Sequence, residues 1–250
     1  MIAWPRPPRV AQAVPPPLPT LDERTSTQPS HSAPDVAPPA AEAREANRAG
    51  VASYARGDLT GAASAFAQAV EANPEDAGAL NNLGQMLVRQ GRPADALVPL
   101  LKAVALDPAS WTYRFNLARA RGLTGDWAGA VEDYRRADAL FPDDYPTLYN
   151  LALALQKANH ADEALPVLER VAALQPEEAS FQLTLGMAYE AARRGQDAVA
   201  AYSRFLDLAP QSSQAPAVRA HLARLQPPLD GPQAVPGALP SAQSLSDPRQ

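Results

Sequence analysis

Residues 77–110 read AGALNNLGQMLVRQGRPADALVPLLKAVALDPAS, and the same spacing of residue types occurs in five copies along the 250-residue chain. The copies begin at Ala43, Ala77, Trp111, Tyr145 and Ala179, at an interval of 34 residues without insertions. Position 32 of every copy is a proline. Because self-similarity at such a period is typical of repeat architectures, this interval is the observation from which the fold can be predicted.

Two columns of residues indicate that each copy forms two packed helices. Position 8 is always glycine or alanine, and position 24 is always large: Phe66, Leu100, Tyr134, Leu168 and Tyr202. Small residues let two helices approach closely, while bulky residues fill the space between them. Turn residues with a left-handed backbone are expected between the two helices, at position 15 and in the last copy at Gly195. The position-15 residues are Gly57, Gly91, Gly125 and Asn159.

Acidic pairs at residues 75–76, 143–144 and 177–178 precede the first helix of three copies. We expect them to cap those helices, because carboxylates accept hydrogen bonds from free N–H groups and oppose the helix dipole. Their recurrence at equivalent turns argues against catalytic dyads.

With the register fixed, residues 77–110 resemble the tetratricopeptide repeat (TPR) at Leu80, Leu83, Gly84, Leu87, Ala96, Leu100, Ala103 and Pro108. The resemblance implies an all-α fold, a right-handed α-solenoid of five TPR helix pairs. The pairs are residues 43–76, 77–110, 111–144, 145–178 and 179–212, and apolar residues at helical spacing predict a capping helix at residues 213–226. Repeat three departs from the pattern at Arg114 and Arg121, where we expect arginine stems to lie along apolar surface.

The flanks, residues 1–40 and 227–250, are rich in proline and predicted to be disordered tails. Proline from Pro5 onward interrupts any signal-peptide core, so the sequence predicts a cytoplasmic protein without direct membrane insertion. A membrane-anchored or periplasmic location is the alternative if the chain begins upstream. Abundant arginine, alanine and proline favour a bacterial source.

Composition argues against several function classes. The net charge is −5 and there is no basic face, so no nucleic-acid partner is expected. The chain has no cysteine, and His31, His160 and His221 are too scattered for a metal site or a catalytic triad. We therefore predict neither a cofactor nor an enzymatic activity.

The TPR resemblance implies that the first helix of each repeat faces a concave groove through positions 2, 5, 6, 9, 12 and 13. Asparagines at position 6 of the middle repeats resemble the asparagine ladder of O-linked N-acetylglucosamine transferases, and their amides can pair with an extended peptide backbone. The alternative is that they bond their own neighbours. The predicted peptide-binding residues are Asn47, Arg48, Asn81, Asn82, Gln85, Phe115, Asn116, Arg119, Tyr149, Asn150 and Leu153.

These columns grade from polar to apolar along the array. We expect a ligand with an acidic end near Arg48 and Arg119 and with apolar anchors near Tyr149 and Leu153. The carboxylate clamp of co-chaperone TPR domains is not met, because Asn47 and Val51 occupy its opening pair.

The sequence thus predicts a non-catalytic scaffold that binds an extended peptide or partner protein. One alternative is an adaptor that assembles with itself or in a membrane complex of the secretion, pilus or envelope type. Another is the regulatory repeat region of a glycosyltransferase-like enzyme whose catalytic part is absent. The sequence leaves the partner and the oligomeric state open.

Overall fold

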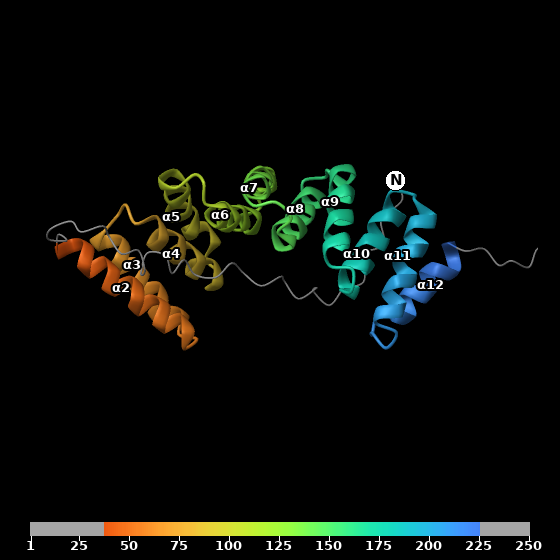
Figure 1. Ribbon diagram of the computed structural model, residues 1–250, viewed down its shortest axis with the longest axis horizontal. Coiled ribbons are helices and arrows are strands. Elements are labelled where there is room, and N and C mark those ends of the chain that lie inside the picture. The colour runs from red at the N-terminus through yellow and green to blue at the C-terminus, as the bar shows by residue number, and fades with distance from the viewer. Residues whose placement is uncertain (1–37, 226–250) are drawn as a thin grey trace, which may run out of the picture.

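The computed structural model describes residues 38–225. In this part of the chain, five antiparallel helix pairs follow one another along a line and a single helix closes the row (Figure 1). The pairs are α2 (Pro38–Ala55) with α3 (Leu59–Ala72), α4 (Ala77–Arg89) with α5 (Pro93–Leu106), α6 (Trp111–Thr124) with α7 (Trp127–Leu140), α8 (Tyr145–Lys157) with α9 (Ala161–Leu174), and α10 (Ala179–Ala191) with α11 (Gly195–Leu208), followed by α12 (Ala215–Leu225).

The bounds follow the 34-residue register. Helices α4, α6, α8 and α10 begin at the first residue of repeats two to five, whereas α2 begins at Pro38, inside the segment predicted to be tail. The rest of the predicted tails, and His31 with them, lies outside the described residues.

Close approach between the two helices of a repeat explains the small residue at position 8. A Cβ added to Gly50 would lie 2.5 Å from Phe66, and one added to Gly84 would lie 2.4 Å from Leu100. Such separations are shorter than carbon atoms tolerate, so the large residue at position 24 packs directly on the backbone at position 8. The predicted pairing of a small column with a large column is confirmed.

The turns between paired helices contain the expected left-handed residues in four repeats. Gly57, Gly91 and Gly125 have φ between 75° and 89°, and Asn159 has φ 65°. In repeat five the prediction of Gly195 was wrong. Arg193 holds position 15 with φ 59°, and Gly195 is the first residue of α11. The array fixes the backbone at this turn, and an arginine adopts it although glycine would do so at lower cost.

The acidic pairs act as caps through their second member in two cases out of three. Asp76 accepts a hydrogen bond from the Ala79 N–H, and Asp144 accepts one from Thr147. Glu178 precedes α10 without such a bond.

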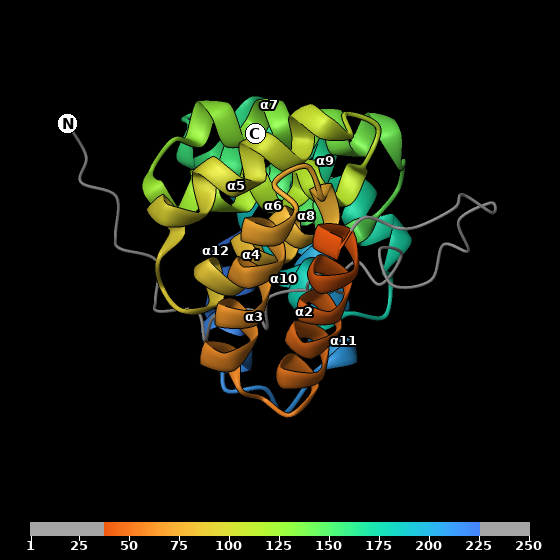
Figure 2. The ribbon, with the colours of Figure 1, turned by 90° about the vertical axis from the view of Figure 1, so that its left-hand side faces the viewer.

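The helix row curves toward the first helix of each pair. Helix α4 contacts α6 and α6 contacts α8, while no two second helices pack comparably in the described region. Viewed along the row, successive pairs rotate about its axis, so that α2, α3, α11 and α12 lie on the same side (Figure 2). We call α2, α4, α6, α8 and α10 the inner helices and their partners the outer helices.

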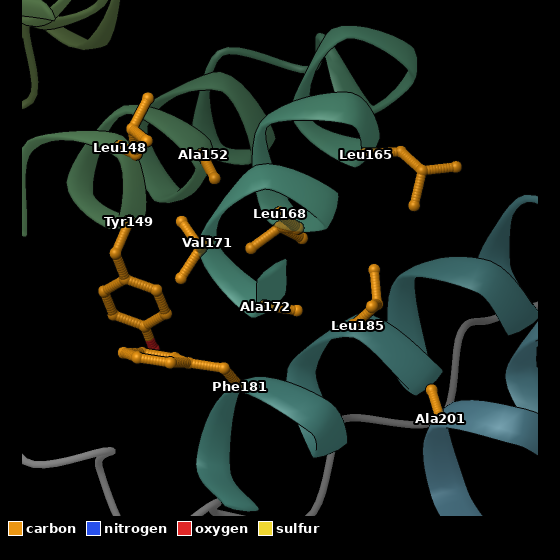
Figure 3. Packing of buried hydrophobic residues seen from close by; sticks show 10 residues of the cluster. All are labelled: Leu148, Tyr149, Ala152, Leu165, Leu168, Val171, Ala172, Phe181, Leu185 and Ala201. Carbon is orange, nitrogen blue, oxygen red and sulfur yellow. The ribbon is translucent and has the colours of Figure 1, made fainter. Parts of the chain in front are cut away.

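Between successive pairs, each inner helix packs against the outer helix of the preceding repeat. Figure 3 shows this packing where α10 meets α8 and α9: Val171 of α9 points toward Tyr149 of α8, and Leu168 of α9 and Leu185 of α10 belong to the same buried cluster. The Tyr149 ring lies 5.2 Å from the Phe181 ring, centroid to centroid. Apolar burial therefore runs continuously from one repeat into the next, as a solenoid requires.

Repeat three contains a buried ion cluster that explains its unusual arginines. Arg121 donates to the Asp133 carboxylate at 2.7 Å, and Arg114 lies 3.6 Å from its other oxygen. The Asp133 side chain is buried between α6 and α7. Burial raises the pKa of Asp133, and the charges of Arg121 and Arg114 oppose that rise. The arginines thus neutralise a carboxylate inside the helix pair.

Helix α12 covers the end of repeat five. Ala215 and Val218 are buried against α11, as the spacing of apolar residues predicts. The His221 ring lies 2.8 Å from the Glu190 carboxylate of α10, which links the closing helix to an inner helix as well. None of the helices in the described part of the chain combines the length and hydrophobicity required to cross a bilayer.

Candidate peptide-binding face

The surface formed by positions 2, 5, 6, 9, 12 and 13 of the inner helices is the candidate site, and we call it the inner face. The structure places seven of the eleven predicted residues inside the repeat junctions: Asn47, Asn81, Asn82, Gln85, Phe115, Asn116 and Tyr149. Arg119 and Asn150 are half-buried, and Arg48 and Leu153 are exposed.

Four of the buried asparagines form a hydrogen-bonded chain across two repeat junctions. The Asn82 amide donates to Asn47 at 3.4 Å, and the Asn116 amide donates to Asn81 at 2.8 Å. Asn81 in turn donates to Asn82 at 3.4 Å. All four residues are at most 3% exposed. We call Asn47, Asn82, Asn81 and Asn116 the amide chain; it joins α2, α4 and α6.

The amide chain follows a simple rule of spacing. In both junctions, position 6 of one repeat donates to position 5 of the repeat before it, 35 residues earlier. Position 5 in repeat three is Phe115, which has no acceptor. The Asn150 amide therefore donates to the Pro146 carbonyl of its own helix at 2.8 Å, and it remains half-exposed.

At the junction between repeats four and five, positions 5 and 6 carry hydroxyl groups in place of amides. Thr184, at position 6 of repeat five, donates to the Ser180 carbonyl of its own helix at 2.9 Å. Tyr149, at position 5 of repeat four, is buried beside it. Burial raises the pKa of the Tyr149 hydroxyl, and the neighbouring Thr184 hydroxyl opposes that rise.

Exposed apolar side chains on the inner face lie in its centre. Leu123, at position 13 of repeat three, is 56% exposed, and Leu153, at position 9 of repeat four, is 37% exposed. The sequence prediction included Leu153 and missed Leu123. The signal for Leu123 was its position, since position 13 belongs to the predicted face.

Two arginines occupy the same two positions one repeat earlier. Arg89 is at position 13 of repeat two, and Arg119 is at position 9 of repeat three. Burial, together with the positive charge of Arg89, lowers the pKa of Arg119, while the Tyr134 hydroxyl acts in the opposite direction. The guanidinium carbon of Arg89 lies 4.9 Å from the centre of the Tyr54 ring, within the range of a cation–π contact.

Metal chemistry has no candidate site in the region that the structure covers, because no three His, Asp or Glu side chains gather there. His160 pairs with Glu163 and His221 with Glu190, so each described histidine has a nearby carboxylate of its own.

Comparison with known proteins agrees with the helix pairs and the register. The family model described as tetratricopeptide repeat matches residues 47–110, 100–145 and 149–213, which together make up more than half of the chain. The chain belongs to the tetratricopeptide repeat family. TPR proteins generally serve as protein-interaction scaffolds, typically without catalysis, and bind protein or peptide partners.

Several solved TPR structures are similar to this chain. The crystal structure of MamA is 26% identical, with a TM-score of 0.61 over 65% of this chain and 95% of that chain. A pilF structure from Pseudomonas aeruginosa is 19% identical, with a TM-score of 0.62 over 75% and 85%. YrrB, described as a TPR protein with an unusual peptide-binding site, is 20% identical, with a TM-score of 0.56 over 66% and 94%. The last two likenesses concern the fold alone, and comparison with curated proteins finds no match.

Proposed function

We propose that this TPR array binds an extended segment of a partner protein along its inner face, without catalysing a reaction. The observation that supports the proposal best is the exposure of Leu123 and Leu153 at positions 13 and 9 of adjacent repeats, on the face where the TPR family places ligands. Neither leucine is needed to fill the core. Exposed apolar side chains on such a face are candidates for burial by a partner.

Within this proposal, the predicted residues divide into two groups. Arg48, Arg119, Asn150 and Leu153 have surface left to contact a ligand. The seven buried residues hold the repeats in register, so that the contacting side chains keep a fixed spacing. A rigid frame lowers the entropy cost of binding, because fewer side chains and helices must be ordered when the ligand arrives.

Selection of peptides from a random library displayed on phage, against the purified full chain, tests the proposal. The enriched peptides are synthesised, and their affinities are measured for the wild type and for Leu123→Ser/Leu153→Ser. Burying a leucine is worth about 1.5–3 kcal/mol, so losing two should weaken binding at least about tenfold. Both leucines are at the surface, and the variant should keep its helix content by circular dichroism.

The matched control is Val98→Ser/Leu101→Ser, which removes apolar surface of the same kind from outer helix α5, where the two residues are 74% and 46% exposed. This control should bind the peptides as the wild type does. Equal affinity of all three proteins, or failure of the library to yield any peptide, would contradict binding at the inner face.

A further inference from the structure

Charge is segregated between the two faces of the array. The inner helices α4, α6 and α8 contain no Asp or Glu, whereas the outer helices α5, α7 and α9 contain several. The basic residues of those three inner helices are Arg89, Arg114, Arg119, Arg121 and Lys157. Arg114 and Arg121 pair with Asp133 inside repeat three, and Arg121 also lies 3.7 Å from the Asp126 carboxylate. Arg89 and Arg119 therefore give the centre of the inner face a positive potential, although the chain is acidic overall.

Arg89 is held in place but incompletely hydrogen-bonded. Its guanidinium lies over the Tyr54 ring, and its buried Nε has no hydrogen-bond partner among the described residues. A buried N–H group without an acceptor is costly, and native structures usually satisfy such groups with protein, water or a ligand. The Tyr54 contact therefore fixes the position of a guanidinium whose hydrogen-bonding capacity the described residues do not fully use.

Arg119 adds a second guanidinium to the centre of the inner face, close enough to Arg89 for the two charges to interact. It is half-buried, forms no ion pair within residues 38–225, and its pKa is lowered first by burial and also by the positive charge of Arg89. Most arginines of the outer helices, by contrast, pair with carboxylates; Arg135, Arg170 and Arg204 are examples. Two neighbouring guanidinium groups without a counter-ion repel each other, and an anion bound between them would remove that repulsion.

We infer that Arg89 and Arg119 together bind the side-chain carboxylate of an Asp or Glu in the partner segment, beside the apolar contact at Leu123 and Leu153. The inference rests on the proposed function and specifies the chemistry of the ligand. It concerns position 13 of repeat two and position 9 of repeat three, and it does not involve Arg48 of repeat one. A carboxylate matches the planar fork of a guanidinium and can accept two hydrogen bonds from it.

The repeat register also gives the spacing of the two contacts. Arg89 and Arg119 are followed 34 residues later, one repeat along the chain, by Leu123 and Leu153. Neighbouring packed helices lie about 8–10 Å apart, and an extended chain advances about 3.3 Å per residue. The acidic residue and the bulky apolar residue of the ligand should therefore be about three positions apart.

The peptides selected from the random library provide the probes for the test. We expect enriched sequences to share an Asp or Glu and a bulky apolar residue at that spacing. Arg89→Gln/Arg119→Gln should bind them at least tenfold more weakly than the wild type. The matched control, Lys102→Gln/Arg204→Gln, also removes two positive charges, but from the outer helices. It should change affinity less than twofold at physiological salt.

A double-mutant cycle identifies the partner of the arginines. Changing the peptide's acid to its amide should weaken binding to the wild type by the same factor as the arginine double variant, and the two changes together should cost little more than either one. If the Gln variant loses helix content, Arg119→Lys keeps the charge but not the fork, and it should still lose several-fold in affinity.

Three outcomes would overturn the inference. Peptides without a shared acid that still depend on Leu123 and Leu153 would refute the carboxylate site and leave the proposed function standing. Binding that requires phosphoserine in place of the acid, or a free C-terminus that amidation abolishes, would assign the arginines to a different anion. A library that yields no binder would refute the proposed function together with the inference.

Discussion

The junction between repeats two and three and the junction between repeats three and four use the same two positions and are held together differently. In the first, the buried Asn116 amide donates to Asn81 of the preceding repeat. In the second, Phe115 stands at the acceptor position and lies in an apolar cluster with Leu151 and Leu155 of α8. The N-terminal half of the array therefore joins its inner helices through buried amides, and the C-terminal half joins them through aromatic and aliphatic contacts.

This difference shows how one residue decides the role of another 35 residues away. Asparagine at position 6 is structural where position 5 of the preceding repeat offers an amide, as Asn81 does for Asn116. Where position 5 is Phe115, Asn150 bonds its own helix and stays half-exposed. A row of identical residues in the sequence is thus not a row of identical sites.

The largest effect on stability is expected from Asp133→Ala in repeat three, where the two halves meet. The substitution leaves Arg114 without an ion-pair partner among the described residues and leaves Arg121 with Asp126 alone, 3.7 Å away. Removing one partner of a buried ion pair costs about 3–5 kcal/mol, because the remaining charge stays buried and unpaired. Urea unfolding followed by circular dichroism measures this loss.

The companion variant replaces all three members of the ion cluster with apolar residues, as Arg114→Met/Arg121→Met/Asp133→Leu. Apolar substitutes of similar volume avoid the desolvation cost, so the triple variant should be within about 1 kcal/mol of the wild type or more stable. If the triple variant is as unstable as Asp133→Ala, the loss comes from packing and the buried charges are not its cause.

A smaller loss of stability should distinguish an asparagine that bonds across a junction from one that bonds its own helix. Asn116→Ala leaves the buried Asn81 carbonyl without the amide that donates to it, which should cost about 1–3 kcal/mol. Asn150→Ala removes a bond within one helix at a half-exposed position, and about 0.5 kcal/mol or less is expected. The same unfolding experiment compares the two variants. Equal losses would show that the junction rule is not what stabilises the N-terminal half.

The fold could be predicted from the sequence because its determinants are local and repeated. The interval of 34 residues, the small residue at position 8 and the large residue at position 24 each appear in all five copies. A repeated signal averages out the exceptions of any one copy. The exception at Arg193 was missed because a left-handed arginine is an unfavourable choice that only the surrounding turn enforces.

The candidate site was predictable to the level of the face, and less so to the level of each residue's role. Which side chains are buried depends on the contact between repeats, and the sequence periodicity does not show that contact directly. The bond from Asn116 to Asn81 could have been found by comparing position 6 with position 5 of the preceding repeat. The ion cluster could have been found by seeking a carboxylate on the outer helix that faces Arg114 and Arg121, where Asp133 lies.

The smallest effect on the free energy of unfolding is expected in the C-terminal half, at alkaline pH, from the titration of Tyr189. Burial, followed by the hydrogen bond that Tyr189 donates to Glu169, raises the pKa of Tyr189 to about 12, against 10 for a free tyrosine. The folded state therefore keeps this proton in a pH range where the unfolded state has lost it. The stabilisation is complete below pH 10 and is lost as the pH rises from 10 to 12.

Tyr189→Phe removes this titration, so its free energy of unfolding should fall less steeply than that of the wild type between pH 10 and 12. Because Tyr189 is only half-buried, solvent screening should keep the difference below about 1 kcal/mol. Glu169→Gln should also flatten the curve, since the charge of Glu169 contributes to the raised pKa. Urea unfolding at several pH values measures these slopes, and identical slopes for the three proteins would mean that the hydroxyl of Tyr189 titrates in the folded array as it does in the unfolded chain.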